Sequence, residues 1–322
     1  MGDMPAVADS FEGAYPRGWY GVLFSDELAC GERRSLHYFG RDFVAWRGAS
    51  GRVAIADAHC PHLGAHLGDG RCEGEDIVCP FHGWRFGQDG RCNAIPYSRR
   101  IPPKARQGAL ATYPVREINQ IIHLWFDPQG GVPDWEPPLL GGLNGEAGWT
   151  RWHVQRWRVR TQGREIIENL VDGPHFAVVH QAPIEDIRFR FEGHIASHDS
   201  LIGGHPTLGR IRTTATYYGP ALQYIDMEGL HRSRQVNCHT PVDHGQVDLC
   251  YAIKLQRDPA LPDTDAIAQD YARHAQAAFA QDIGIWERKI YRPQPLLCES
   301  DGPLFELRHW YRQFFGTAPA PA

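Results

Sequence analysis

The sequence predicts an α+β protein of two domains, the first built of strands and the second combining strands with a long helix. Three observations support this fold class. The 322 residues exceed the size of one typical domain. Short strand-like segments fill positions 17–128, whereas helical and strand-like patterns alternate over 151–315. Residues 129–150 between them are rich in Pro and Gly, which is typical of a linker.

The first domain is predicted to consist of short strands joined by tight turns. Strand-forming residues gather over Arg52–Asp57, Asp76–Val78 and Gln120–Asp127. Turn signals such as Gly68-Asp69-Gly70 and Gln88-Asp89-Gly90 separate them. Such a pattern is typical of a β-rich domain.

The second domain begins with a helical pattern over Gly163–Val171, which Gly173-Pro174 interrupts. Strand-like alternation follows over Arg210–Tyr218 and Val247–Lys254. An Ala-rich amphipathic stretch from Thr264 to Arg288 has good helix formers and no internal Pro. We therefore expect one long helix there.

Net charge and the length of apolar runs argue against a nucleic-acid-binding or membrane-spanning protein. The formal charge of −5 gives no overall attraction to nucleic acid or to an anionic membrane, and no apolar run is long enough to span a bilayer. The first residues carry acids and lack the apolar core of a signal peptide, so we expect a cytoplasmic protein. In that reducing compartment the eight cysteines are expected to bind metal or remain free thiols.

The strongest motif is a pair of mixed Cys/His loops. Cys60-Pro61-His62 is followed, after sixteen residues, by Cys79-Pro80-Phe81-His82. Two thiolates and two imidazoles are the ligand set of a Rieske [2Fe–2S] centre, with Cys60 and Cys79 on one iron and His62 and His82 on the other. A structural zinc site is the alternative, although zinc fingers usually pair Cys with Cys and His with His.

A second candidate metal site lies in the stretch from Glu168 to His180. His175 and His180, with one carboxylate from elsewhere, would form the facial triad of a non-haem Fe(II) enzyme. Their spacing differs from the i, i+4 pairing of one helical face, so we expect a break at Gly173-Pro174 or a bulge to bring them together. On the residues alone, two half-buried histidines remain an alternative. The candidate carboxylates are Asp282 and, less favoured, Asp270, Glu287 and Asp301.

The chain resembles the Rieske non-haem iron oxygenases over nearly its whole length. Within them it looks most like the steroid-acting group of 3-ketosteroid 9α-hydroxylases and cholesterol 7-desaturases. The stretches that carry the resemblance are Gly18-Trp19, DAHCPHLGAHLGDG, CPFHGWRFGQDGRCNAIPYSRRIPPKA, REIIENLVDGPHF, FEGHIAS, QDIGIWERKIY and RHWYRQFF.

The resemblance implies an N-terminal Rieske β-domain and a C-terminal helix-grip domain, in which an antiparallel sheet surrounds a long helix. It implies that His175, His180 and Asp282 bind iron, and that Asp172 bridges an iron ligand to a cluster ligand of a neighbouring subunit. Asn169 aligns with a family Asn near the iron. The implied assembly is a head-to-tail homotrimer.

The implied activity is O2-dependent hydroxylation of a C–H bond in a steroid or sterol-like substrate. Electrons from NAD(P)H would arrive through a separate flavin and iron–sulfur reductase or a ferredoxin. Desaturation, a non-steroid substrate, and a Rieske carrier without active mononuclear iron remain alternatives. A sterol-sized ligand needs a largely apolar pocket, which the stretch Tyr217–Tyr224 and the region of Phe176 would line unless they form core.

Overall fold

The computed structural model describes residues 13–143, 145, 147–205, 209–261 and 263–316. The chain divides into two compact units. One unit holds Trp19–Phe126 and Val132–Glu146, and the other holds Met1–Gly18, Asp127–Gly131 and Ala147–Ala322. The N-terminal segment in which no signal peptide was expected lies largely outside the described residues. Among the described helices, none has the length and apolar character to cross a membrane.

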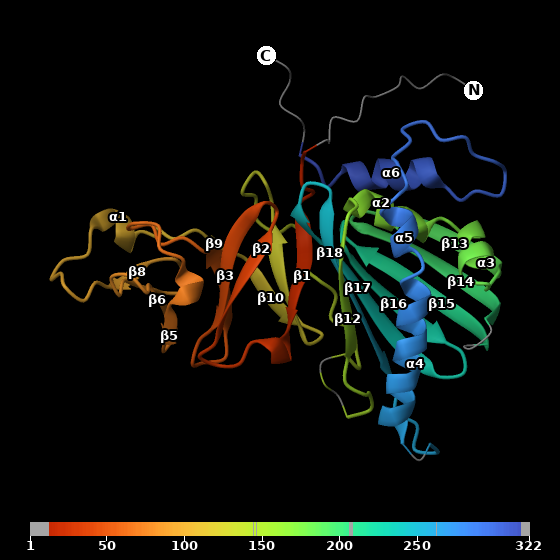
Figure 1. Ribbon diagram of the computed structural model, residues 1–322, viewed down its shortest axis with the longest axis horizontal. Coiled ribbons are helices and arrows are strands. Elements are labelled where there is room, and N and C mark those ends of the chain that lie inside the picture. The colour runs from red at the N-terminus through yellow and green to blue at the C-terminus, as the bar shows by residue number, and fades with distance from the viewer. Residues whose placement is uncertain (1–12, 144, 146, 206–208, 262, 317–322) are drawn as a thin grey trace. The chain divides into compact units, whose positions relative to one another are not determined.

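Three small sheets form the N-terminal unit (Figure 1), with strand orders β1-β11-β10, β2-β3-β4-β9 and β5-β6-β7-β8. The predicted strands over 52–57, 76–78 and 120–127 are confirmed to within one residue as β4, β6 and β11. The elements are β1 (Gly18–Phe24), β2 (Arg33–Tyr38), β3 (Arg41–Arg47), β4 (Val53–Asp57), β5 (Arg71–Glu73), β6 (Asp76–Val78), β7 (Arg85–Phe86), β8 (Cys92–Ala94), α1 (Pro103–Arg106), β9 (Thr112–Tyr113), β10 (Val115–Ile118) and β11 (Ile121–Phe126).

Aromatic side chains fill the core of this unit. Trp19, Trp46 and Trp125 are fully buried or nearly so. Trp19 also donates its indole N–H to the backbone oxygen of Trp135 at 2.7 Å, which ties part of the Pro/Gly-rich stretch to β1. The packed sheets hold two loops in place, one between β4 and β5 and one between β6 and β7, and these loops carry the Cys/His motifs.

A seven-stranded antiparallel sheet, in the order β12-β18-β17-β16-β15-β14-β13, forms the C-terminal unit with six short or medium helices. The predicted strands over 210–218 and 247–254 are confirmed as β15 and β18. The elements are β12 (His153–Val159), α2 (Gly163–Ile167), the 3-10 helix η3 (Glu168–Leu170), α3 (Pro174–Val179), β13 (Ile184–Glu192), β14 (Ile195–His205), β15 (Gly209–Tyr218), β16 (Leu222–Glu228), β17 (Arg232–Asp243), β18 (Gln246–Leu255), α4 (Thr264–Phe279), α5 (Ile283–Trp286) and α6 (Leu304–Arg312).

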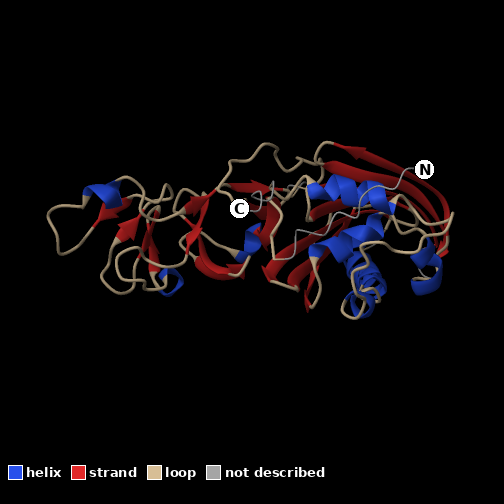
Figure 2. Cartoon of the chain, turned by 90° about the horizontal axis from the view of Figure 1, so that it is seen from above, coloured by secondary structure: helices blue, strands red, loops and turns tan. Residues whose placement is uncertain are grey.

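Helix α4 lies along one face of this sheet (Figure 1), and Figure 2 shows the helices gathered on that face. Its buried side chains, among them Tyr271 and Ala275, pack against Tyr251 and Ile253 of β18. This burial of an amphipathic stripe on a sheet stabilises the helix more than its propensity does. The predicted helix-grip architecture is therefore present.

The long helix predicted over Thr264–Arg288 is wrong in one respect, because it divides into α4 and α5. Between them the amides of Gln281, Asp282 and Ile283 bond to carbonyls three residues back rather than four. Such bonds tighten the turn and rotate the residues that follow. The predicted helix over 163–171 likewise tightens into η3 after Ile167, and the interruption at Gly173-Pro174 is observed.

Candidate metal centres and cavity

The two Cys/His loops share one backbone frame. The amide of Cys60 donates to Ala65 and its carbonyl accepts from Gly64, both at 2.9 Å. Cys79 repeats this pattern, since its amide donates to Trp84 at 2.8 Å and its carbonyl accepts from Gly83 at 3.0 Å. The glycine four residues after each cysteine takes a positive φ, of 75° and 70°, which allows the chain to fold back. Each loop thus presents one thiol and one imidazole from the same kind of turn.

The side chains of these loops fit an iron–sulfur cluster. The Nδ1 atoms of His62 and His82 are buried and have no hydrogen-bond partner within the described residues, and the two ring centroids lie 4.8 Å apart. Burial and the facing thiol of Cys79 raise the pKa of Cys60 to about 12, against the weaker opposing effect of loop amides. Two buried thiols and two unsatisfied ring nitrogens are stabilised when a cationic group binds among them.

Aromatic rings surround the two imidazoles. Trp84 stacks on His62 with centroids 4.6 Å apart and donates its indole N–H to the Tyr97 hydroxyl at 2.7 Å. Phe81 lies 3.8 Å from the His82 ring and is 63% exposed. The histidine side of the site is therefore shielded by rings that themselves reach the surface of this unit.

The second candidate centre brings together His175, His180 and Asp282, whose ligand atoms lie within 4.8 Å of one another. Residues five apart lie about 140° apart on a regular helix. The two rings nevertheless meet at 5.3 Å between centroids, because His180 is the C-cap of α3 and takes φ −100° and ψ −2°. The interruption at Gly173-Pro174 lies before both histidines and marks the start of α3. The rings come together because α3 ends at His180, and not because of that interruption.

Hydrogen bonds set the same tautomer for both rings. Nδ1 of His175 lies 2.5 Å from the Asp172 backbone oxygen, and Nδ1 of His180 lies 3.1 Å from Oε1 of Gln281. Each Nδ1–H therefore donates to an oxygen, which leaves Nε2 as the basic atom that a metal needs. Burial opposes charge on His180, but hydrogen bonds that the ring donates to Asp282 and Gln281, together with the negative charge of Asp282, outweigh it and raise the pKa of His180.

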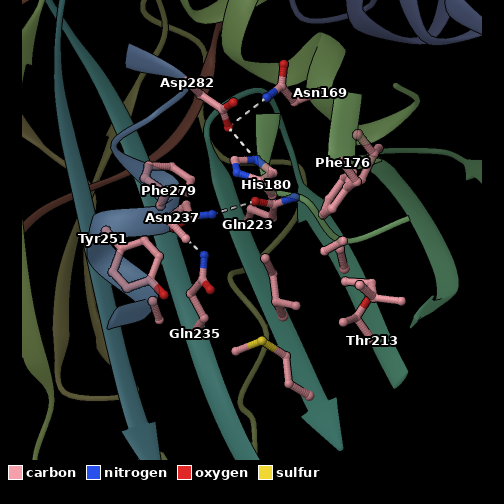
Figure 3. A pocket seen from close by; sticks show the side chains of 18 of the residues that line it. Asn169, Phe176, His180, Thr213, Gln223, Gln235, Asn237, Tyr251, Phe279 and Asp282 are labelled. Carbon is pink, nitrogen blue, oxygen red and sulfur yellow. Dashed lines mark hydrogen bonds and ion pairs between the residues drawn. The ribbon is translucent and has the colours of Figure 1, made fainter. Parts of the chain in front are cut away.

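Asp282 is buried and faces the histidines because of the tightened turn that begins α5. Its Oδ2 lies 3.4 Å from Nε2 of His180 and accepts a hydrogen bond from Nδ2 of Asn169 at 3.2 Å. Trp286 donates its indole N–H to Oδ1 of Asn169 at 3.3 Å. Because an indole can only donate, this contact fixes the Asn169 amide with its NH2 group toward Asp282 (Figure 3).

Asp172 differs from the other acids because its side chain is 49% exposed. Its Oδ1 accepts the backbone N–H of His175 at 3.2 Å and lies 3.6 Å from Nδ1 of that ring. One face of this carboxylate therefore holds His175, while the other remains accessible on the surface of the C-terminal unit.

A cavity of about 180 Å³ opens beside the three candidate ligands, between α3, α4 and the sheet. Phe176, Ile225 and Met227 give it a mostly apolar wall. Tyr217 and Gln223 also line it, so part of the stretch Tyr217–Tyr224 faces the cavity, while Tyr224 is buried elsewhere. An apolar chamber with a few polar groups suits a small apolar ligand.

Comparison with known protein families accounts for both halves of the chain. The Rieske [2Fe–2S] domain matches residues 18–114, and the 3-ketosteroid 9α-hydroxylase C-terminal domain matches residues 124–315. The chain belongs to the 3-ketosteroid 9α-hydroxylase family of Rieske oxygenases. It is 36% identical to a 3-ketosteroid-9-alpha-monooxygenase oxygenase component of Rhodococcus rhodochrous, over 96% of this chain and 82% of that protein.

Two further relatives lie in the same group. A 3-ketosteroid-9-alpha-monooxygenase oxygenase component of Mycobacterium tuberculosis is 31% identical, over 94% of this chain and 82% of its own length. A cholesterol 7-desaturase of Xenopus laevis is 28% identical, over 98% of this chain and 74% of its own length. Among solved structures, apo dicamba monooxygenase superposes with a TM-score of 0.71 at 18% identity, covering 92% of this chain and 96% of that one. This last likeness shows the fold.

Membership of the 3-ketosteroid 9α-hydroxylase family establishes the cofactors and the reaction class. The chain is an oxygenase component that uses a Rieske [2Fe–2S] cluster and mononuclear iron, with electrons from NAD(P)H supplied through a reductase. The structure places Cys60, His62, Cys79 and His82 on adjacent loops of the Rieske unit, and it gathers Asn169, His175, His180 and Asp282 at one end of the cavity. Asp172 lies beside His175.

Several functional candidates in this 3-ketosteroid 9α-hydroxylase family member were missed from the sequence. Gln281 accepts a hydrogen bond from His180, and Trp286 donates one to Asn169. Both residues lie in the QDIGIW stretch beside Asp282. His198 lines the cavity and is held at Nδ1, 2.7 Å from the Leu170 carbonyl. Their proximity in the sequence to Asp282 could have identified Gln281 and Trp286 as candidates. Nothing local in the sequence marks His198, because only strand pairing brings β14 to the site.

Proposed function

We propose that this chain hydroxylates a C–H bond of a steroid or sterol-like substrate bound in the cavity beside His175, His180 and Asp282. The observation that carries the proposal is the position of this candidate triad in the wall of an apolar cavity. Relatives that share a third of the sequence are named for action on 3-ketosteroids. The alternative of a carrier without mononuclear iron would leave two histidines and a carboxylate converged without a use.

The proposed site assigns a role to each group of residues. Cys60, Cys79, His62 and His82 hold the cluster, and His175, His180 and Asp282 hold the iron, which when bound activates O2 with electrons from the cluster. Gln281 and the Asp172 carbonyl accept hydrogen bonds from Nδ1 of the two rings, which orients Nε2 of each ring toward the iron. Asn169 occupies one lone pair of Asp282 and orients that carboxylate. The apolar wall excludes water and positions the substrate.

Asp172 is the proposed link between subunits. Its exposed carboxylate can reach a histidine of a neighbouring copy while it holds His175, as expected for a head-to-tail homotrimer. A reductase or ferredoxin is the proposed electron donor. Cys60 and Cys79 are proposed cluster ligands, and the other six cysteines form no disulfide. The proposed location is the cytoplasm.

The size of the cavity bears on the substrate. A volume of about 180 Å³ is below the roughly 300–1,000 Å³ of typical ligand pockets. A four-ring substrate therefore requires movement of flexible side chains such as Met227, or leaves some rings outside the cavity. Desaturation on the same site is the second candidate, because one relative is named a cholesterol 7-desaturase.

The test is turnover of the iron-loaded protein with a surrogate reductase, NADH and O2, offering 4-androstene-3,17-dione and cholesterol. A product heavier by one oxygen supports the hydroxylase, and a product lighter by two hydrogens supports the desaturase. His175→Ala serves as the control that lacks a proposed iron ligand but keeps the cluster loops. If the wild-type protein retains its iron and neither steroid changes, the steroid assignment is wrong.

A further inference from the structure

Three buried amide side chains lie together on the sheet wall of the cavity. Gln223 belongs to β16, whereas Gln235 and Asn237 belong to β17, and their exposed fractions are 8%, 6% and 3%. Residues two apart on a strand share a face, so Gln235 and Asn237 both face the cavity. Strand register then sets Gln223 directly opposite Asn237.

Hydrogen bonds join these amides into a chain with one direction. Gln235 donates from Nε2 to Oδ1 of Asn237 at 2.9 Å, and Asn237 donates from Nδ2 to Oε1 of Gln223 at 2.8 Å. Figure 3 shows the chain on the sheet, facing the same cavity as His180 and Asp282. Each amide bonds to its neighbour, so the chain ends at the carbonyl oxygen of Gln235 on one side and at the NH2 group of Gln223 on the other.

That terminal NH2 group has no partner among the described residues. A largely buried donor without an acceptor is unfavourable, and natural proteins usually satisfy such a group with water or ligand. The wall near Gln223 includes the apolar side chains of Ile225 and Met227 and the hydroxyl group of Tyr217, which lies opposite Gln223 in the sheet but forms no hydrogen bond with it. A substrate oxygen inside the cavity can fill this position.

We propose that the chain of Gln235, Asn237 and Gln223 recognises an oxygen substituent of an otherwise apolar substrate, a carbonyl in the polarity seen here. The inference rests on the proposed function and names the functional group that the cavity selects. Reversing all three amides together keeps both internal hydrogen bonds and presents an oxygen, which suits a hydroxyl group. Anchoring the substrate at this oxygen fixes which C–H bond faces His180 and Asp282, so the amide chain sets regiochemistry.

The test compares ligands that differ only in oxygen. Tryptophan fluorescence reports binding, because Trp286 lines the cavity. One ligand pair is androstane-3,17-dione and androstane, and the smaller pair is 2-decalone and decalin. The wild-type protein is expected to bind each ketone about tenfold more tightly than its hydrocarbon, the contribution of about one hydrogen bond. Gln223→Met and Gln223→Glu should both lose this preference, and Gln223→Glu keeps an acceptor for Asn237.

Met227→Leu is the matched control, since it changes the shape of the same strand face without changing a hydrogen bond. It should alter the affinities for ketone and hydrocarbon by the same factor. A third outcome is that neither steroid binds, that 2-decalone binds more tightly than decalin, and that Gln223→Met abolishes this preference. The role of the amide chain is then supported, and the steroid assignment is wrong. If the wild-type protein shows no preference for a ketone, or both Gln223 variants retain it, the inference is overturned.

Discussion

At the scale of single residues, the candidate iron site depends on side chains that fix the orientation of its ligands. Asn169 donates a hydrogen bond to Oδ2 of Asp282. Trp286 donates to the amide oxygen of Asn169 and so orients its NH2 group toward Asp282. Partners of this kind orient ligating groups and contribute substantially to metal affinity. The three candidate ligands would bind the iron, but the orientation of Asp282 also depends on Asn169 and Trp286.

Asn169→Ala removes the hydrogen bond that orients Asp282. We expect iron affinity at the mononuclear site to fall about 10- to 100-fold, since that is the usual effect of losing such a partner. The measurement is an iron titration of protein whose cluster is intact, with the cluster absorbance as internal reference. Trp286→Phe keeps an aromatic ring but loses the N–H, so it should weaken iron binding in the same direction by less. Unchanged affinity in both variants would show that the amide is not a positioning group.

His239 carries a second prediction at this scale. Its ring is buried in β17, both nitrogens lack partners within the described residues, and burial lowers its pKa to about 3. Below pH 6.5 the unfolded chain binds a proton that folded His239 does not, so stability falls by about 1.4 kcal/mol per pH unit. His239→Leu should raise the free energy of unfolding by about 1 kcal/mol at pH 7.5 and reduce the loss toward pH 5. Denaturant unfolding at both pH values measures this, and parallel pH dependences would contradict it.

At the scale of elements, the short connections position the chemistry. The loops Cys60–Gly64 and Cys79–Gly83 repeat one turn, and α3 ends at His180 so that two rings meet. The turn between α4 and α5 rotates Asp282 toward them. Sheets and long helices provide the rigid frame, and the irregular segments between them hold the candidate ligands.

Gly64 and Gly83 occupy equivalent positions in the two loops but have different surroundings, so their substitution by alanine can be compared. Both take a positive φ, but an added Cβ at Gly83 would lie 2.9 Å from Cγ of Pro96, whereas at Gly64 it would meet no atom within 4 Å. Gly64→Ala should therefore cost only the strain of the left-handed conformation, about 1–2 kcal/mol. Gly83→Ala should cost more and lower the fraction of chains that retain a cluster. Unfolding free energy and cluster absorbance per chain measure the pair, and equal losses in both variants would rule out the steric contribution of Pro96.

At the scale of the whole molecule, the sequence predicted the architecture, and the side chains proposed for each metal site lie close together in the structure. Strands such as Asp76–Val78 were predicted to the residue because turn residues bound them on each side. The break before Asp282 was not predicted, because the stretch has no Pro there and its helix-forming residues continue to Arg288. Hydrogen bonds connect this turn and α5 to Asn169 of η3 and His180 at the end of α3, and local propensity does not report such long-range contacts.

The amide chain shows the same limit. Gln223 and Asn237 are fourteen positions apart, and nothing near either residue indicates a ligand-binding role. Their pairing follows from the register of β16 and β17, which depends on the whole sheet. Motifs confined to one loop could be predicted from their spacing, whereas a cavity lined by residues of five strands and five helical segments could not.

We propose that this chain transfers oxygen from O2 to a steroid bound beside His175, His180 and Asp282. A single turnover tests it most directly. The protein is loaded with both cofactors, reduced chemically without a reductase, and mixed with 4-androstene-3,17-dione and ¹⁸O2. We expect a steroid alcohol carrying one labelled oxygen, formed as the cluster absorbance returns to its oxidised spectrum, and no labelled product from Asp282→Ala. Oxidation of the cluster with equal or absent labelled product in both proteins would contradict it.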